Sequence, residues 1–109
     1  MISTPELIFD GILTPVPHQY SRPVRAWRDN SVQITVMVTE RYNDPGISIT
    51  NSVGEWLTEC RTRWPHANIR LIEHYPESAT RYSEALLTDN IPHWHYLNTN
   101  DIETTYHLN

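Results

Sequence analysis

The sequence contains no lysine, since all eight of its basic residues are arginine. A lysine nucleophile and a Schiff-base mechanism are therefore excluded. Cys60 is its single cysteine, which excludes a disulfide framework within the chain and a zinc site built from several thiolates. Arginine makes planar, bidentate contacts that suit recognition surfaces, although compositional drift is an equally simple reason for its exclusive use.

Glycines and long apolar runs are also scarce. There are three glycines, and Gly46 has no neighbouring glycine to let a backbone loop approach a phosphate group. No apolar run is long enough to span a membrane, and no signal peptide is evident. We therefore expect a cytoplasmic protein with no membrane partner, and nothing in the sequence indicates a cofactor.

The charge balance is acidic, with 13 acidic against 8 basic residues and a net charge of −5. A general nucleic-acid binder shows a basic stripe instead. A nucleic-acid partner is therefore not expected.

The 109 residues, 39% of them hydrophobic, match the size of one domain. Prolines interrupt the beginning of the chain, so residues 1–23 are predicted to form an irregular arm in which only 7–9 could be a short strand. Residues 24–109 are predicted to form a single α+β domain. The prolines of the arm are Pro5, Pro15, Pro17 and Pro23.

Two periodic patterns define the centre of this domain. Residues 32–39 alternate β-branched and other side chains, which predicts a strand that forms a hairpin with residues 24–28. An apolar stripe then predicts a helix from about Thr50 to Trp64, which Ser48 or Thr50 would cap and Pro65 would end. The stripe consists of Val53, Trp56, Leu57, Cys60 and Trp64.

Further strands are predicted over residues 69–75, 81–88 and 93–97. Asn100 and Glu103 have the spacing of a capping box, which predicts a short C-terminal helix. The resulting fold is α+β, in the order ββαβββ, with a mainly antiparallel sheet of four to five strands and one long helix on one face. The other face would then be polar, or covered by the arm or by a second subunit.

Two motifs resemble those of a group of short bacterial proteins. The first is G-x-S-[IV]-T-N, here Gly46 to Asn51, and the second is I-E-H-Y-P, here Ile72 to Pro76. The similarity spans roughly residues 20 to 97, the length of one ordinary domain. It implies a shared fold and no assigned activity.

Six histidines raise the question of a metal site or of acid–base catalysis. His93 and His95 would project from the same face of a strand, where His74 could join them as a third ligand for zinc. Glu84 is a candidate partner that would orient His74 for proton transfer. The alternative is an edge strand whose imidazoles are solvated, with His74 bonded to the loop beside it.

Arginine and tryptophan also gather on the first strand of the hairpin, at Arg22, Arg25, Trp27 and Arg28. These residue types dominate binding hot spots. The alternative is a tryptophan covered by arginine stems.

The first hypothesis is thus a small non-catalytic interaction module that binds another protein or a second copy of itself through this strand and the free sheet face. By analogy, it could be an inhibitor or accessory factor of a mobile element or phage. The second hypothesis is a histidine-dependent metal-binding protein or enzyme that uses His74, His93 and His95, or His74 with Glu84.

Overall fold

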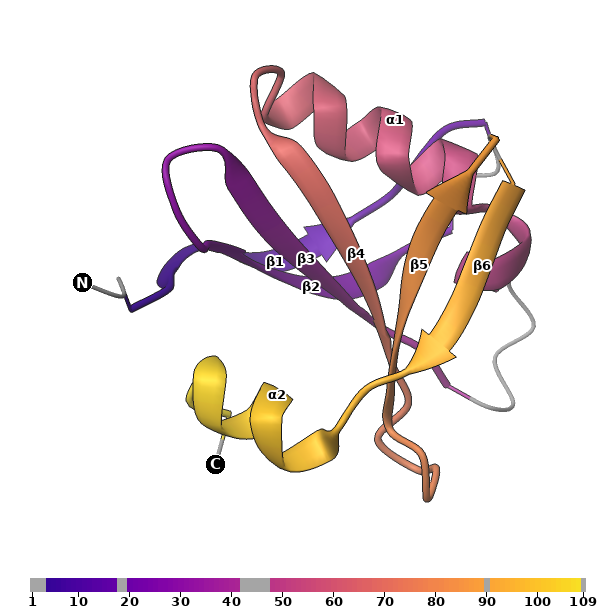
Figure 1. The fold of residues 1–109 in the computed structure, drawn as a ribbon. Coiled ribbons are helices and arrows are strands. Elements are labelled where there is room, and N and C mark those ends of the chain that lie inside the picture. The colour runs from indigo at the N-terminus through magenta and orange to yellow at the C-terminus, as the bar shows by residue number, and fades with distance from the viewer. Residues whose placement is uncertain (1–3, 18–19, 42–47, 90, 109) are drawn as a thin grey trace.

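A single sheet organises the chain, and its strands follow one another in sequence order, as Figure 1 shows. The computed structural model describes residues 4–17, 20–41, 48–89 and 91–108. Within them the elements are β1 (Glu6–Leu13), β2 (Arg22–Arg28), β3 (Gln33–Thr39), the 3-10 turn η1 (Ile49–Asn51), α1 (Val53–Arg63), β4 (Asn68–His74), β5 (Tyr82–Thr88), β6 (Ile91–Tyr96) and α2 (Thr99–Thr105). Gly46 and Ile47 of the first motif lie outside the described residues.

The expected sheet of four to five strands is wrong in number, because the described chain forms six. The additional strand is β1, so the interpretation of residues 1–23 as an irregular arm is wrong for Glu6–Leu13. Pro23 fits this pairing because it faces Ile12 of β1, while the ladder between β2 and β3 begins at Val24. Its missing N–H therefore leaves no gap in the β2–β3 ladder.

The sheet is mixed. The β2–β3 hairpin is confirmed, and antiparallel pairing also joins β1 to β2, β4 to β5 and β5 to β6. β3 and β4 are parallel, with Val36 beside Leu71. The helix α1 lies in the connection between them, which supplies the long crossover that a parallel pair needs.

Both predicted helices are present, but the first is shorter than expected. Residues 49–51 form the separate turn η1, where the Asn51 amide donates to Ser48 Oγ at 3.3 Å, and α1 extends only from Val53 to Arg63. The short C-terminal helix is confirmed as α2, although its N-cap is Asn98 and not Asn100. None of the helices in the described part of the chain is long and apolar enough to cross a membrane.

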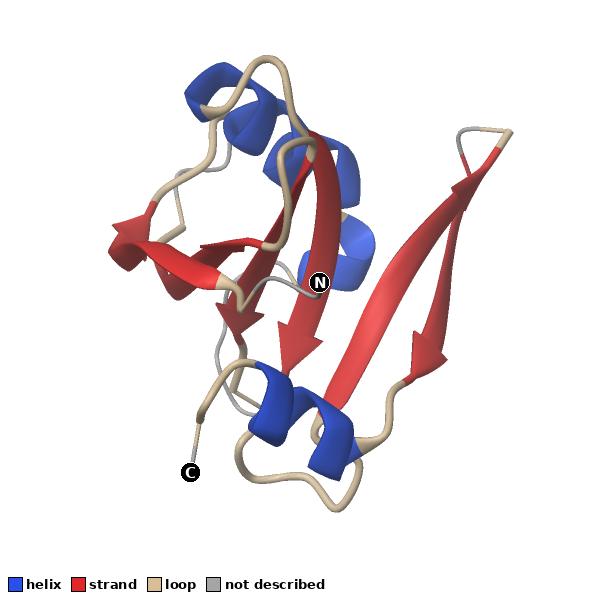
Figure 2. Cartoon of the chain, turned by 60° about the vertical axis from the view of Figure 1, so that its left-hand side comes forward, coloured by secondary structure: helices blue, strands red, loops and turns tan. Residues whose placement is uncertain are grey.

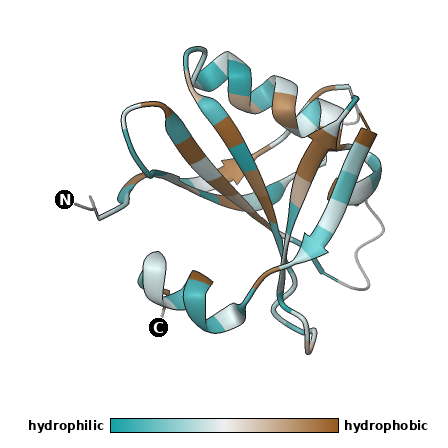
Figure 3. Ribbon diagram, in the orientation of Figure 1, coloured by the Kyte–Doolittle hydropathy of each residue, from teal (hydrophilic) through white to brown (hydrophobic). Residues whose placement is uncertain are grey.

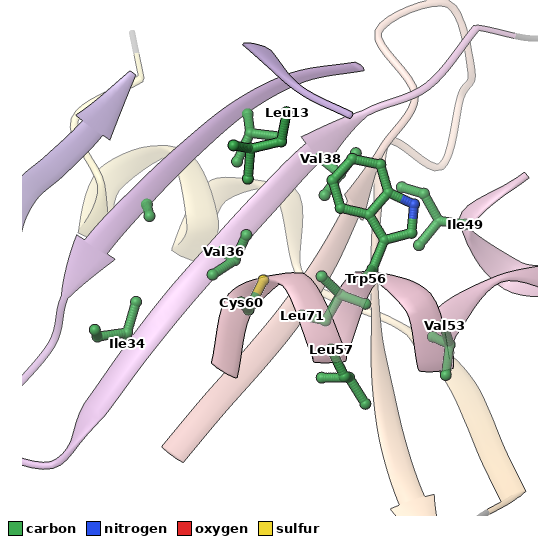
Figure 4. Close-up of a cluster of buried hydrophobic side chains, with 12 residues drawn as sticks. Leu13, Ile34, Val36, Val38, Ile49, Val53, Trp56, Leu57, Cys60 and Leu71 are labelled. Atoms are coloured by element: carbon green, nitrogen blue, oxygen red, sulfur yellow. The ribbon is translucent and has the colours of Figure 1, made fainter. Parts of the chain in front are cut away.

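The larger core lies between α1 and one face of the sheet. The predicted apolar stripe faces this core, and Trp56 and Cys60 are both fully buried in it (Figure 4). Its other buried members are Leu13, Val24, Ala26, Ile34, Val36, Val38, Ile49, Val53, Leu57 and Leu71.

The second face of the sheet is not free, contrary to the expectation that it would meet a partner. α2 folds back beneath it (Figure 1), and Ile102 and Tyr106 pack against strand residues there. Those residues are Trp27, Met37, Ile72 and Tyr82. The central strand β3 is therefore buried on both faces over Ile34–Val38.

Candidate functional site

The four residues predicted as a binding surface do not form one. Arg22 and Trp27 are both 4% exposed, whereas Arg25 and Arg28 are exposed. Neighbouring strand positions point to opposite faces, so Arg22 and Arg28 lie on the α1 face and the other two on the α2 face. The Trp27 ring packs on Tyr106, with 4.7 Å between ring centroids, and the Arg22 Nε atom lies 3.3 Å from Glu40 Oε1.

The candidate histidines are not brought together either. His74 lies on β4, whereas His93 and His95 lie on β6, and β5 separates the two strands. Among residues 4–17, 20–41, 48–89 and 91–108, no group of three or more His, Cys, Asp or Glu side chains is placed to hold a metal ion.

Glu84 was expected to partner His74, but it contacts other residues. Its Oε1 atom lies 3.0 Å from His95 Nε2, and its Oε2 atom accepts a hydrogen bond from Arg70. In the antiparallel register Glu84 faces Ile72 on β4 and His95 on β6, and His74 faces Tyr82. The register therefore places the Glu84 carboxylate beside His95 of the edge strand β6, and not beside His74.

A gap between β4 and β5 is the first feature that could bind a partner. The two strands pair only from Leu71 with Ala85 to His74 with Tyr82. The β5–β6 hairpin diverges from the rest of the sheet, as Figure 2 shows, and the register places this divergence beyond Ala85. Within the described part of the chain, residues 68–70 of β4 then have only β3 beside them, and residues 86–88 of β5 have only β6 beside them.

A pocket of about 440 Å³ occupies this gap, and we call it the wedge groove. Its walls include residues from both sheet faces, so it lies between the strands. They are Gln33, Leu57, Ile69, Arg70, Leu71, Glu84, Ala85, Leu86 and Leu87. An adjoining pocket of about 400 Å³ lies beside α1 and shares Leu57 and Leu87 with the wedge groove.

The hairpin that forms one wall of the wedge groove is apolar and exposed. Leu86, Leu87 and Ile91 are 53%, 44% and 59% exposed, and Figure 3 shows hydrophobic residues at this end of the hairpin. The sequence carried a signal for this site: two adjacent leucines cannot both point into one core, because neighbours on a strand face opposite ways.

A second pocket, of about 390 Å³, lies on the α2 face, and we call it the His74 pocket. The His74 ring stacks on Tyr82 with 4.6 Å between centroids. Burial lowers the pKa of His74, and the charges of Arg81 and Arg25 lower it further. The pocket is lined by Asp10, Pro23, Val24, Arg25, Met37, Thr39, His74, Pro76, Arg81, Tyr82, Glu103 and Leu108.

Two carboxylates, Glu40 and Glu73, are buried near η1 at 2% and 5% exposure. Glu40 Oε1 accepts a hydrogen bond of 3.2 Å from the Ile49 amide and pairs with Arg22. Burial raises the pKa of both carboxyl groups. No pattern in the sequence indicated this cluster, because its members come from distant segments.

Comparison with protein-family models, curated proteins and solved structures finds no match to this chain.

Proposed function

We propose that this protein is a small non-catalytic interaction module that binds an extended segment of another polypeptide in the wedge groove. The divergence of β4 and β5 supports this most directly, because among the residues that the structure describes, 68–70 and 86–88 each pair with a strand on one side only. A strand edge of this kind presents backbone N–H and C=O groups that can pair with an incoming strand.

The walls of the groove favour a segment with alternating apolar side chains. Ile69 and Leu87 face its α1 side, where they would bury side chains of the bound segment that point that way. Burial of apolar area there contributes roughly 25 cal/mol per Å² before the entropy of ordering the peptide is subtracted. Exposed apolar residues grouped at one site are typical of interaction surfaces.

Charge at the base of the groove is balanced, because the Glu84 carboxylate pairs with the Arg70 guanidinium group. A strongly charged segment would therefore gain little there, and a mainly apolar one fits better. A module of this size suits an inhibitor or accessory factor, by analogy with the small proteins of mobile elements and phage.

The test is selection of peptides from a random library displayed against the wild-type protein. We expect the selected peptides to alternate apolar and polar residues. They should also protect from exchange those amides of residues 86–88 that point away from β6 and into the groove. Methylation of alternate peptide nitrogens should abolish binding, because it removes the main-chain donors. Equal affinity of a methylated peptide would contradict the proposal.

Two matched variants locate the site. Leu87→Asp places a charge in the groove and should weaken peptide binding by at least about tenfold, which corresponds to about 1.4 kcal/mol. Ile12→Asp alters an apolar residue that is 66% exposed on the edge strand β1, away from the groove. This variant should bind the peptides as tightly as wild type. Sedimentation of the wild type and both variants measures their mass in solution. A dimer that Leu87→Asp disrupts and Ile12→Asp does not would show that the bound polypeptide is a second copy of the chain.

A further inference from the structure

The His74 pocket has charged groups on several of its walls. Arg25 comes from β2, Asp10 from β1 and Glu103 from α2, and Arg81 directly precedes β5. The pocket lies on the α2 face, beside the point where the parallel strands β3 and β4 end at Thr39 and His74. It is therefore separate from the wedge groove.

The ion pair between the Arg25 guanidinium group and the Asp10 carboxylate is weak. Arg25 Nε lies 3.7 Å from Asp10 Oδ1, and the two side chains are 52% and 61% exposed. Ion pairs this exposed contribute about 0–1 kcal/mol. A ligand carboxylate inside the pocket can therefore compete with Asp10 for Arg25.

Arg81 also has donors to spare. It pairs with Glu103 through Nη2, and its side chain is 38% exposed. A guanidinium group carries five N–H donors in a planar fork, so one carboxylate partner does not use them all. A single guanidinium group can donate two parallel N–H bonds to one oxyanion, and the pocket is lined by two such groups, Arg25 and Arg81.

The electrostatic field in the pocket favours an anion beside His74. The charges of Arg81 and Arg25 each act on the His74 ring more strongly than the opposing charge of Glu103. At the hydroxyl group of Tyr82, whose ring stacks on His74, Glu103 acts more strongly than Arg81.

Apart from the hydroxyl groups of Thr39 and Tyr82, the rest of the pocket is apolar. Met37 and Tyr82 are 4% and 3% exposed, and Val24, Leu108 and two prolines complete the walls. Pockets that join apolar walls to a few convergent polar groups are typical of small-molecule sites.

We propose that the His74 pocket binds a small organic carboxylate, whose anionic group lies between Arg25 and Arg81 beside His74 and whose apolar body lies against Met37 and Leu108. This inference is independent of the proposed peptide site. A bound carboxylate would raise the pKa of His74, because an opposite charge nearby favours the protonated ring. Binding should accordingly strengthen as the pH falls toward that pKa.

The experiment titrates sodium benzoate into the full chain and follows the imidazole signals of the histidines by NMR. His66, on the α1 side of the sheet, is the internal reference. Benzyl alcohol tests the need for the carboxylate, inorganic phosphate tests the need for the apolar body, and sodium chloride at matched ionic strength is the salt control. Arg25→Gln alters an exposed side chain and should leave the melting temperature nearly unchanged.

We expect a saturable shift of the His74 signals with benzoate and a raised pKa of His74 in the bound state. Arg25→Gln should weaken this binding about tenfold, as for loss of one charged hydrogen bond, while Arg61→Gln on α1 should not change it. Equal binding of benzyl alcohol, tighter binding of phosphate, or an unchanged affinity in Arg25→Gln would each overturn the proposal.

Discussion

Thr50 Oγ1 donates a hydrogen bond of 3.2 Å to Glu73 Oε2, and this contact joins the two sequence motifs. The same carboxylate oxygen accepts from the Tyr75 hydroxyl at 3.1 Å, and Glu73 Oε1 accepts from Ser83 Oγ at 3.2 Å. Both motifs therefore supply groups that surround one buried carboxyl group. This structural role accounts for Thr50, Glu73 and Tyr75 without any catalytic function.

Glu73 should make stability depend on pH. Burial raises its pKa in the folded protein above the ordinary value of 4.5, although three hydroxyl donors act in the opposite direction. The folded state then binds the proton more tightly than the unfolded state, so the stabilising contribution is full below pH 4.5 and is lost as the pH rises through the folded-state pKa. Glu73→Gln should remove this dependence, which urea denaturation at a series of pH values measures.

The control for this measurement is Glu77→Gln, which removes one negative charge from an exposed position in the turn after β4. The stability of wild type minus that of Glu73→Gln should decrease as the pH rises above 4.5, and this decrease should exceed any change in the same difference for Glu77→Gln. Parallel curves for the two variants would show that Glu73 has no raised pKa.

The local parts of the fold could be predicted because hydrophobic periodicity indicates the type of element. The alternation over residues 32–39 and the stripe from Val53 to Trp64 both correspond to elements of the structure. β1 was missed because a register shift between Leu7 and Phe9 breaks its alternation. The parallel pair was also missed, although a strand, a helix and a strand in succession allow parallel pairing.

The sites depend on long-range register, which periodicity does not report. His93 and His95 share a face as the spacing predicts, but which residue faces His95 is set by the pairing of β5 with β6. In the same way, Trp27 was read as a surface residue because nothing local indicates that Tyr106 covers it. The wedge groove results from a ladder that ends early, which no single segment reveals.

Tyr106 should anchor α2 to the sheet through its hydroxyl group. This oxygen lies 3.0 Å from Asp29 Oδ1 and 2.9 Å from Thr35 Oγ1, and it accepts a hydrogen bond of 3.3 Å from Arg70 Nη1. The residue is 5% exposed. Tyr106→Phe keeps the ring against Trp27 and removes only these polar contacts, so we expect a loss of about 1–3 kcal/mol in the free energy of unfolding.

The matched control is Tyr96→Phe, at a tyrosine that is 76% exposed on β6. Surface changes of this kind alter the free energy of unfolding by no more than about 0.5 kcal/mol. Chemical denaturation followed by tryptophan fluorescence measures both variants. If the two tyrosines gave the same small effect, the hydrogen bonds of Tyr106 would contribute nothing to the docking of α2.

Cys60 should be inert in the folded protein. Its side chain is fully buried between α1 and the sheet, and burial raises the pKa of the thiol to about 12. The thiolate is the reactive species. A disulfide reagent at pH 8 should therefore label the native protein on the order of a thousandfold more slowly than the chain in denaturant, given a stability of about 5 kcal/mol or more.

The control is Thr58→Cys in a Cys60→Ala background, which places a thiol at an exposed position on the same helix and should react at the rate of a free thiol. Rapid labelling of Cys60 in native protein would instead show that α1 opens locally from the sheet, because no reagent can reach the sulfur while that core is closed.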